Sequence, residues 1–148
     1  MAVLVVRHAK AGDRERWSGP DEDRPLTDAG MIQADALVGV LAEFRVERVL
    51  SSPYLRCRQT VAPLASALGL PVEPTDDLAE GAGAAARRLV ASLTGPADTV
   101  LCTHGDVLYD LLSGLDLPWD SPMKKASTWV LEVKEGGIAT ARYLPPPR

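Results

Sequence analysis

The fold is decided by the opening stretch Ala2-Val3-Leu4-Val5-Val6-Arg7-His8. Its first five residues form an apolar run that is too short for a helix and is rich in β-branched side chains. Such a run is typical of a strand that is buried on both faces, as strands of a parallel sheet are. We therefore predict a strand over Ala2–Val6 that leads directly into the polar pair Arg7-His8.

Strand and helix patterns alternate in the residues that follow. After a polar loop over Lys10–Pro25, Thr27 has the character of an N-cap, and it opens a predicted helix from Asp28 to about Phe44. The apolar face expected for this helix consists of Ile32, Ala36, Leu37, Val40 and Leu41. Further extended segments are predicted at Arg48–Leu50, Pro71–Pro74 and Thr99–Cys102. Further helices are predicted at Tyr54–Leu68, at Ala84–Leu93 and after Thr103-His104-Gly105-Asp106 as far as Leu112.

The end of the chain changes to a period of two. Thr128–Val133 and Ile138–Tyr143 flank Glu135-Gly136-Gly137, which predicts a β-hairpin. The whole pattern predicts an α/β fold of three layers, α/β/α, with a mainly parallel central sheet and an antiparallel C-terminal margin. We find no repeat or linker, so one domain is expected over residues 1–148. The hairpin edge could pair with a second subunit, so a homodimer stays open.

Composition excludes several classes of partner. Hydrophobic residues make up 46% of the chain and charged residues 24%, as in ordinary globular proteins, and the net charge of -4 gives no general attraction to nucleic acid or acidic membranes. No apolar run approaches the roughly 18–20 residues of a membrane span, and the N-terminus is expected to be a strand rather than a signal peptide. Cys57 and Cys102 are expected to be buried apolar side chains in a reducing cytoplasm.

Three predicted strands end in polar residues, and ligands of open α/β sheets bind at such ends. The segments are Arg7-His8-Ala9-Lys10, Ser51-Ser52-Pro53-Tyr54-Leu55-Arg56 and Thr103-His104-Gly105-Asp106. The chain has only two histidines, and each follows a predicted buried strand. A neutral imidazole can attack phosphorus, and arginine binds phosphate oxygens through a planar fork. These residue types favour a phosphoryl-transfer site without metal or cofactor, since a zinc site would need further ligands.

Four longer motifs point to a particular family. The family's motifs are, in order, Arg-His-Gly, Leu-Thr-x-x-Gly-x-x-Gln-Ala, Ser-Ser-Pro…Arg…Gln-Thr and His-Gly. In this chain they are matched, in the same order, by Arg7-His8-Ala9, Leu26–Ala34, Ser51–Thr60 and His104-Gly105. This order resembles the histidine phosphatase superfamily, also called phosphoglycerate mutase-like. Alanine at position 9, where glycine is usual, resembles the short phosphohistidine phosphatase-like branch.

The resemblance implies a role for each matched residue. His8 would be the phosphorylated nucleophile, and Arg7, Arg56 and His104 would bind the phosphoryl group. Glu80 resembles the acid that many members use to protonate the leaving oxygen, although it could instead belong to a solvated acidic turn with Asp76 and Asp77. Asp106 is a weaker candidate for this acid and is expected to be an N-cap.

Other residues are left with two alternatives each. Arg24, Lys10, Lys124 and Lys125 either rim the cleft and select an anionic substrate or are solvated surface charges. Ser52 binds phosphate or caps its helix, Thr103 orients the pocket or ends its strand, and Trp17 and Trp119 flank a base or sugar or pack. Arg58 is expected to point away from the site.

The short span between Thr60 and His104 leaves little room for a closed sugar pocket, so an open site for a bulky substrate is expected. Our leading hypothesis is a phosphatase that acts on protein phosphohistidine or another phosphomonoester, with a phosphorylated protein or small molecule as its partner. A nucleotide or small-metabolite phosphatase is the second hypothesis. A non-catalytic phosphate-binding module is the third, and the nucleophile-like His8 argues against it.

Overall fold

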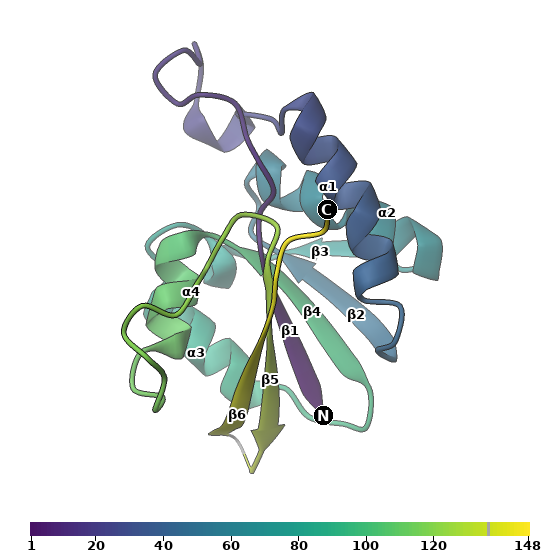
Figure 1. The fold of residues 1–148 in the computed structure, drawn as a ribbon, viewed down its shortest axis with the longest axis vertical. Helices are drawn as coiled ribbons and strands as arrows, with labels where there is room; N and C mark the ends of the chain where they lie inside the picture. The colour runs from purple at the N-terminus through teal and green to yellow at the C-terminus, as the bar shows by residue number, and fades with distance from the viewer. Residues whose placement is uncertain (136) are drawn as a thin grey trace.

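Six strands form one sheet in the computed structural model, which describes residues 1–135 and 137–148 (Figure 1). The strands are β1 Ala2–Arg7, β2 Val46–Ser51, β3 Val72–Pro74, β4 Asp98–Thr103, β5 Thr128–Lys134 and β6 Gly137–Leu144. The helices are α1 Asp28–Val40, α2 Leu55–Leu68, α3 Gly83–Ser92 and α4 Gly105–Leu112, with short 3-10 helices η1 Asp21–Asp23 and η2 Asp76–Leu78. The sheet order is β3-β2-β4-β1-β5-β6; β3, β2, β4 and β1 run parallel, β5 is antiparallel to β1, and β6 is antiparallel to β5. The predicted fold class is therefore confirmed.

Alternate residues of the central strand bury opposite faces of the sheet. Val3 and Val5 pack in the cluster formed with α3 and α4, whereas Leu4 and Val6 pack in the cluster formed with α1 and α2. All four side chains are fully buried. Figure 1 shows the two helix pairs on either side of the sheet. The continuous apolar run of β1 thus follows from a strand that is covered on both faces.

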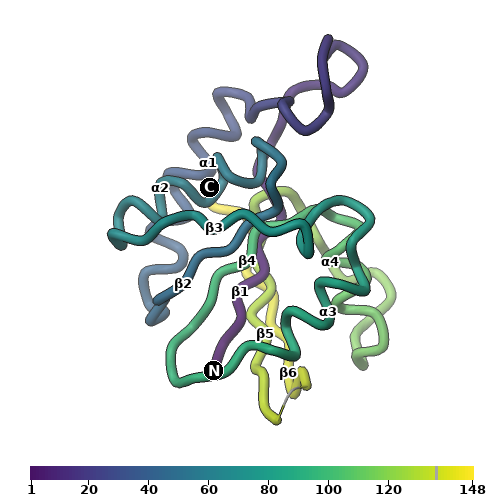
Figure 2. The backbone as a smooth tube through the Cα atoms, turned by 180° about the vertical axis from the view of Figure 1, so that it is seen from behind, coloured from purple at the N-terminus to yellow at the C-terminus, as the bar shows by residue number. Residues whose placement is uncertain are grey.

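The carboxyl ends of β1 and β4 lie side by side. Arg7 pairs with Thr103 in the parallel register, and the His8 backbone N–H donates to the Thr103 carbonyl at 3.1 Å. Because His104 follows Thr103, the two histidines leave the sheet at the same edge. The loop after β1 rises beyond this edge before the chain returns to α1 (Figure 2).

Helix α1 differs from the prediction in its buried face and its end. Thr27 is confirmed as the N-cap, because its Oγ1 accepts from the Gly30 N–H at 3.1 Å. The apolar face was placed wrongly at Ile32, which is 69% exposed. The cause is a close approach at Gly30, where a Cβ atom would lie 2.0 Å from the Lys10 carbonyl oxygen. This contact turns Gly30 inward, and the helix ends at Val40 rather than near Phe44.

Motif residues on α1 and α2 hold the loop that follows His8. The backbone N–H of Lys10 donates to Gln33 Oε1 at 3.0 Å. The N–H of Ala9 donates to Thr60 Oγ1 at 2.9 Å, and the Thr60 hydroxyl donates in turn to the Arg56 carbonyl at 2.7 Å. Gln33 and Thr60, both residues of the matched motifs, therefore fix the backbone that follows His8 through hydrogen bonds.

At the C-terminus, β5 and β6 pair in antiparallel register as predicted, and β6 lies at the edge of the sheet. Gly136, in the predicted turn, lies outside the described residues. In the part of the chain that the structure describes, none of the helices combines the length and the apolar character that a bilayer span needs.

Candidate active site

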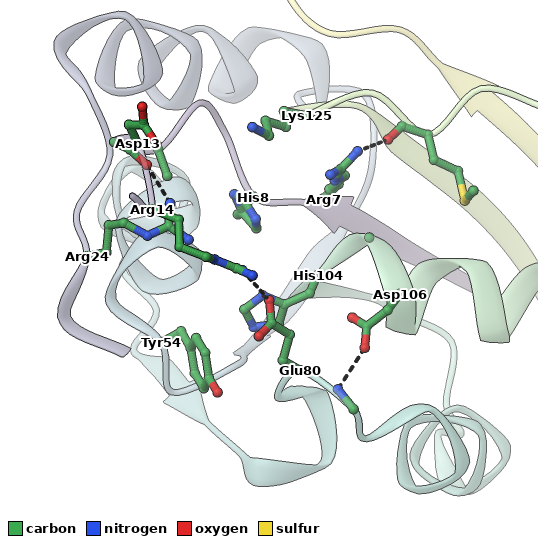
Figure 3. A pocket seen from close by; sticks show the side chains of 15 residues that line it. Arg7, His8, Asp13, Arg14, Arg24, Tyr54, Glu80, His104, Asp106 and Lys125 are labelled. Atoms are coloured by element: carbon green, nitrogen blue, oxygen red, sulfur yellow. Dashed lines mark hydrogen bonds and ion pairs between the residues drawn. The ribbon is translucent and has the colours of Figure 1, made fainter. Parts of the chain in front are cut away.

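A cleft of about 970 Å³ opens at the carboxyl ends of β1 and β4 (Figure 3). It is lined by Arg7, His8, Ala11, Gly12, Asp13, Arg14, Arg24, Tyr54, Glu80, Gly81, His104, Gly105, Asp106, Met123 and Lys125. The lining is strongly polar and contains charges of both signs. Within residues 1–135 and 137–148, no three His, Cys, Asp or Glu side chains are grouped as ligands of a metal ion.

His8 lies on the floor of the cleft, where its side chain is almost fully buried. Its Nδ1 is 2.8 Å from the Ala9 carbonyl oxygen. Since a carbonyl only accepts, Nδ1 carries the proton of the neutral ring and Nε2 keeps its lone pair. Burial, together with the nearby His104 and arginine side chains, lowers the pKa of His8 from 6.5 to about 3. The ring is therefore neutral at physiological pH, and Nε2 carries an unprotonated lone pair.

His104 stands beside His8, with a distance of 5.6 Å between ring centroids. Its Nε2 lies 2.8 Å from Ser52 Oγ and 3.6 Å from Cys57 Sγ. Ser52 Oγ already accepts from the Tyr54 N–H at 3.2 Å, so the Ser52 hydroxyl can donate to His104. His104 Nδ1 is a buried atom without a hydrogen-bond partner among the described residues.

Arg7 crosses the start of helix α4. Its Nη1 donates to the Met123 carbonyl at 2.7 Å, and its Nε is buried without a partner among the described residues. A Cβ at position 105 would lie 3.0 Å from Arg7 Cζ. Gly105 therefore allows the guanidinium to lie against the helix, which explains the glycine of the His-Gly motif.

Arg56 is fully buried and lies behind the cleft rather than on its lining. Its Nη2 contacts Asp21 Oδ2 at 3.0 Å and Glu80 Oε1 at 3.3 Å, and Nη1 donates to the Asp21 carbonyl at 2.8 Å. Its Cζ lies 4.9 Å from the centre of the Tyr54 ring. Arg56 Nε has no partner within the described residues. Arg56 is thus held by two residues of the cleft lining, Tyr54 and Glu80, and by Asp21.

Glu80 lies on the side of the cleft opposite Lys125 (Figure 3). Its Oε1 lies 3.1 Å from Arg14 Nη2 and 3.9 Å from His104 Nδ1, in addition to its contact with Arg56. Figure 3 shows Arg14 reaching from the loop after β1 to this carboxylate. The alternative of a purely solvated turn does not describe Glu80, because its carboxylate faces three site residues.

Asp106 also lines the cleft, but the N-cap prediction for it is wrong. His104 is the N-cap of α4, and Asp106 lies in the first turn of the helix. Its Oδ2 accepts from the Gly81 N–H at 2.8 Å, so it fixes the turn that follows Glu80. The error arose because this tertiary contact replaces a local capping bond.

The structure separates the residues that had two alternatives. Arg24 and Lys125 line the cleft, whereas Lys10 and Lys124 do not. Ser52 does two things, since its hydroxyl contacts His104 and accepts from the Tyr54 N–H. Thr103 donates to the Leu78 carbonyl at 2.7 Å, two residues before Glu80, and Arg58 donates to the Pro53 carbonyl outside the cleft.

Neither tryptophan lines the cleft. The Trp17 indole N–H donates to the Pro20 carbonyl within its own loop, and Trp119 is 97% exposed rather than packed.

Four site residues were missed by the sequence interpretation: Asp13, Arg14, Asp21 and Tyr54. The first three lie in the polar loop after β1, where no periodicity indicates which side chains turn inward. Burial alone would raise the pKa of Asp21, but hydrogen bonds from Arg24 and Arg56 hold it below its ordinary value. For Tyr54 a signal existed, because it lies two residues before Arg56 in the matched segment.

Fold and cleft together define an α/β protein with two histidines and two arginines gathered at one end of a mainly parallel sheet. The family model described as "Histidine phosphatase superfamily (branch 1)" matches residues 3–89, and the chain belongs to this superfamily of phosphatases. Cys57 and Cys102 are free and buried, as the sequence predicted.

Two curated relatives and one solved structure are similar to this chain. The 8-oxo-(d)GTP phosphatase of Mycolicibacterium smegmatis is 38% identical over 98% of this chain and 48% of its own length. The phosphohistidine phosphatase SixA of Escherichia coli is 39% identical over 48% of this chain and 44% of its own length. The matches thus span about half the length of these relatives. A structure of the protein histidine phosphatase SixA complexed with tungstate shares the fold, with a TM-score of 0.72 over 99% of this chain and 96% of that chain, at 24% identity.

Proposed function

We propose that this phosphatase hydrolyses its substrate through a covalent phosphohistidine on Nε2 of His8. The observation that carries the proposal is the fixed ring of His8. Nδ1 is committed to the Ala9 carbonyl at 2.8 Å, so only Nε2 can act as nucleophile. The low pKa of His8, about 3, keeps that nitrogen unprotonated. A pure binding module would have no need for such an arrangement.

Arg7, Arg56 and His104 are proposed to bind the phosphoryl group. Each contributes a buried nitrogen without a partner among the described residues: Nε of each arginine and Nδ1 of the histidine. Buried polar groups normally find partners, and the two arginine N–H groups, with His104 Nδ1 when it carries a proton, suit the oxygens of a phosphate. The first turn of α4, which His104 caps, adds backbone N–H groups of the same polarity.

The reaction then has two displacements. His8 Nε2 attacks phosphorus, the new N–P bond forms, and the bond from phosphorus to the leaving atom breaks with its electron pair on that atom. The leaving atom is an oxygen in a phosphomonoester and a ring nitrogen in protein phosphohistidine. Glu80 gives a proton to the leaving atom and is then a carboxylate. That carboxylate accepts a proton from water as the water attacks phosphorus and the N–P bond breaks. Phosphate is released, and His8 and Glu80 return to their starting states.

Two classes of substrate remain in the proposal. Protein phosphohistidine, which is a phosphoramidate, or a phosphomonoester suits the open cleft, which is much larger than a single phosphoryl group. A nucleotide is the second class, and the 38% identity over 98% of this chain to an 8-oxo-(d)GTP phosphatase favours it. Because the chain spans about half of that relative, the match alone does not carry its activity over. We place either activity in a reducing compartment such as the cytoplasm, in keeping with the free Cys57 and Cys102.

The test is to trap the intermediate. Wild type and His8→Gln are mixed rapidly with an aryl phosphate carrying labelled phosphorus, quenched, and assayed for label on protein that acid releases and base does not. We expect label on wild type only. Label that persists on the His8→Gln variant would reject the nucleophile assignment, and aryl alcohol released by wild type without label would reject the covalent route. A panel of phosphohistidine protein, nucleotides and sugar phosphates then ranks substrates by kcat/KM.

A further inference from the structure

Lys125 is a cation of the cleft that the proposed chemistry does not use. Burial and the charges of Arg7, Arg24, Lys10 and Arg56 lower the pKa of Lys125. Among the described residues, the ion pairs at the cleft join Arg14, Arg24, Arg56 and His104 to Asp21 or Glu80, and Arg16 to Asp13, and none includes Lys125. The lysine therefore lines the cleft with its charge uncompensated, on the same side as Arg7 (Figure 3).

The position of Lys125 is fixed by the backbone around the nucleophile. The next residue, Ala126, is fully buried and has a φ of 64°, which is uncommon for alanine. Its N–H lies 3.0 Å from the Arg7 carbonyl and 3.2 Å from the His8 carbonyl, and the Arg7 N–H donates to Ser127. These bonds hold the backbone in a strained conformation. Because Ala126 is bonded to the end of β1, the backbone of its neighbour Lys125 is held close to Arg7 and His8. Neighbouring Cα atoms are about 3.8 Å apart.

The direction of the displacement places the leaving group near Lys125. His8 lies on the floor with 7% of its surface exposed, whereas Lys125 is an exposed residue at the mouth. The attacking and leaving atoms of a phosphoryl transfer are roughly in line. The leaving group therefore points from His8 toward the mouth, where Lys125 stands across from Glu80.

We propose that Lys125 binds a second phosphate group, bonded directly to the transferred one, so that the favoured substrates are phosphoanhydrides such as nucleoside diphosphates. This inference rests on the proposed function. His8 Nε2 attacks the terminal phosphorus, and the bond from that phosphorus to the bridging oxygen breaks. The electron pair stays on the bridging oxygen, which becomes an oxygen of the departing phosphate, and Lys125 offsets its charge. Water then releases the terminal phosphate from His8.

The experiment compares neighbouring lysines. Lys125→Met removes the charge and keeps the aliphatic stem, and Lys124→Met is the matched control because Lys124 is exposed and does not line the cleft. We measure kcat/KM for a nucleoside diphosphate and for the monophosphate of the same base. For Lys125→Met we expect the ratio of the two values to fall about tenfold, since a hydrogen bond to a charged group contributes about this much. Lys125→Arg should restore most of the ratio, and Lys124→Met should leave it unchanged.

A binding measurement separates this inference from the proposed function. In the His8→Gln background, which lacks the nucleophile, calorimetry with pyrophosphate and with orthophosphate reports the subsite without turnover. We expect Lys125→Met to weaken pyrophosphate about tenfold and orthophosphate much less. Equal weakening of both anions, or no change, overturns the subsite even if His8 is labelled. Absence of label on His8, with pyrophosphate binding that still depends on Lys125, overturns the proposed function and supports the subsite.

Discussion

Acidification from pH 7 to pH 4 probes the protonation state of His8. Burial holds its pKa at about 3 in the folded protein, against 6.5 for an ordinary histidine. The unfolded chain therefore takes up a proton near pH 6.5 that the folded protein does not take up until about pH 3. Folding stability associated with neutral His8 is present above pH 6.5 and is lost as the pH falls toward 3.

The size of this loss follows from the pKa difference. Between pH 6.5 and pH 4 the unfolded state binds about one more proton than the folded state, and each pH unit then costs about 1.4 kcal/mol. We expect wild type to lose about 3 kcal/mol more than His8→Gln between pH 7 and pH 4, because the carboxylates titrate in both proteins. Urea unfolding of the two proteins at both pH values measures the difference.

Nuclear magnetic resonance tests the same property directly. The chain has only two histidines, so the His8→Gln variant assigns both ring signals. We expect the His8 signal to stay that of a neutral ring protonated on Nδ1 down to about pH 4. A His8 midpoint near 6.5, or equal losses of stability in wild type and variant, would refute the inference that burial keeps His8 neutral.

Three further predictions concern the close contact at Gly30, the proposed phosphate-binding role of Arg56 and the proposed acid Glu80. Gly30→Ala should lower the free energy of unfolding by about 1–3 kcal/mol, because its Cβ would clash with the Lys10 carbonyl oxygen in the loop after β1. Gly39→Ala is the control and should raise the free energy of unfolding by about 0.5–1 kcal/mol, because its Cβ would have no atom within 4 Å. Equal shifts of the two variants in urea unfolding would contradict this reasoning. Arg56→Met should lower kcat/KM for an aryl phosphate by about 100-fold or more, whereas Arg58→Met should change it less than about threefold; similar losses would remove Arg56 from the phosphate site. Glu80→Gln should lower kcat about 100-fold for an alkyl phosphate and much less for nitrophenyl phosphate, whose leaving group needs no proton, and equal losses would reject Glu80 as the acid.

The strand pattern and the motifs predicted the fold and the location of the cleft because both have local causes. An apolar run such as Val3–Val6 indicates a doubly covered strand wherever it occurs. His8 and His104 each follow such a run, and parallel strands bring their carboxyl ends to the same edge. Adjacency of β1 and β4 then places the two rings 5.6 Å apart. The roles of His8, Arg7, Arg56, His104 and Glu80 stay predictions that the experiments above address.

Contacts between distant segments could not be predicted from local patterns. Ile32 is apolar and fits a helical stripe, yet the approach of the Lys10 carbonyl to Gly30 turns α1 so that Ile32 faces solvent. Asp106 has the composition of a cap, yet it bonds to the turn after Glu80. Asp21 lies in an aperiodic loop whose partners are arginines elsewhere in the chain.

The hydroxyl of Thr60 has a consequence for how this site tolerates change in the rest of the chain. It accepts from the Ala9 N–H and donates to the Arg56 carbonyl, so one buried group joins the backbone next to His8, the proposed nucleophile, to the backbone of the arginine proposed to bind phosphate. The two bonded segments are 51 residues apart in sequence. This oxygen therefore contributes to the spacing of the two segments, together with the contacts that Gln33 and Gly30 of α1 make with the loop after His8. Insertions and deletions in exposed parts of the path that leave these contacts in place can accumulate while His8 and Arg56 keep their spacing.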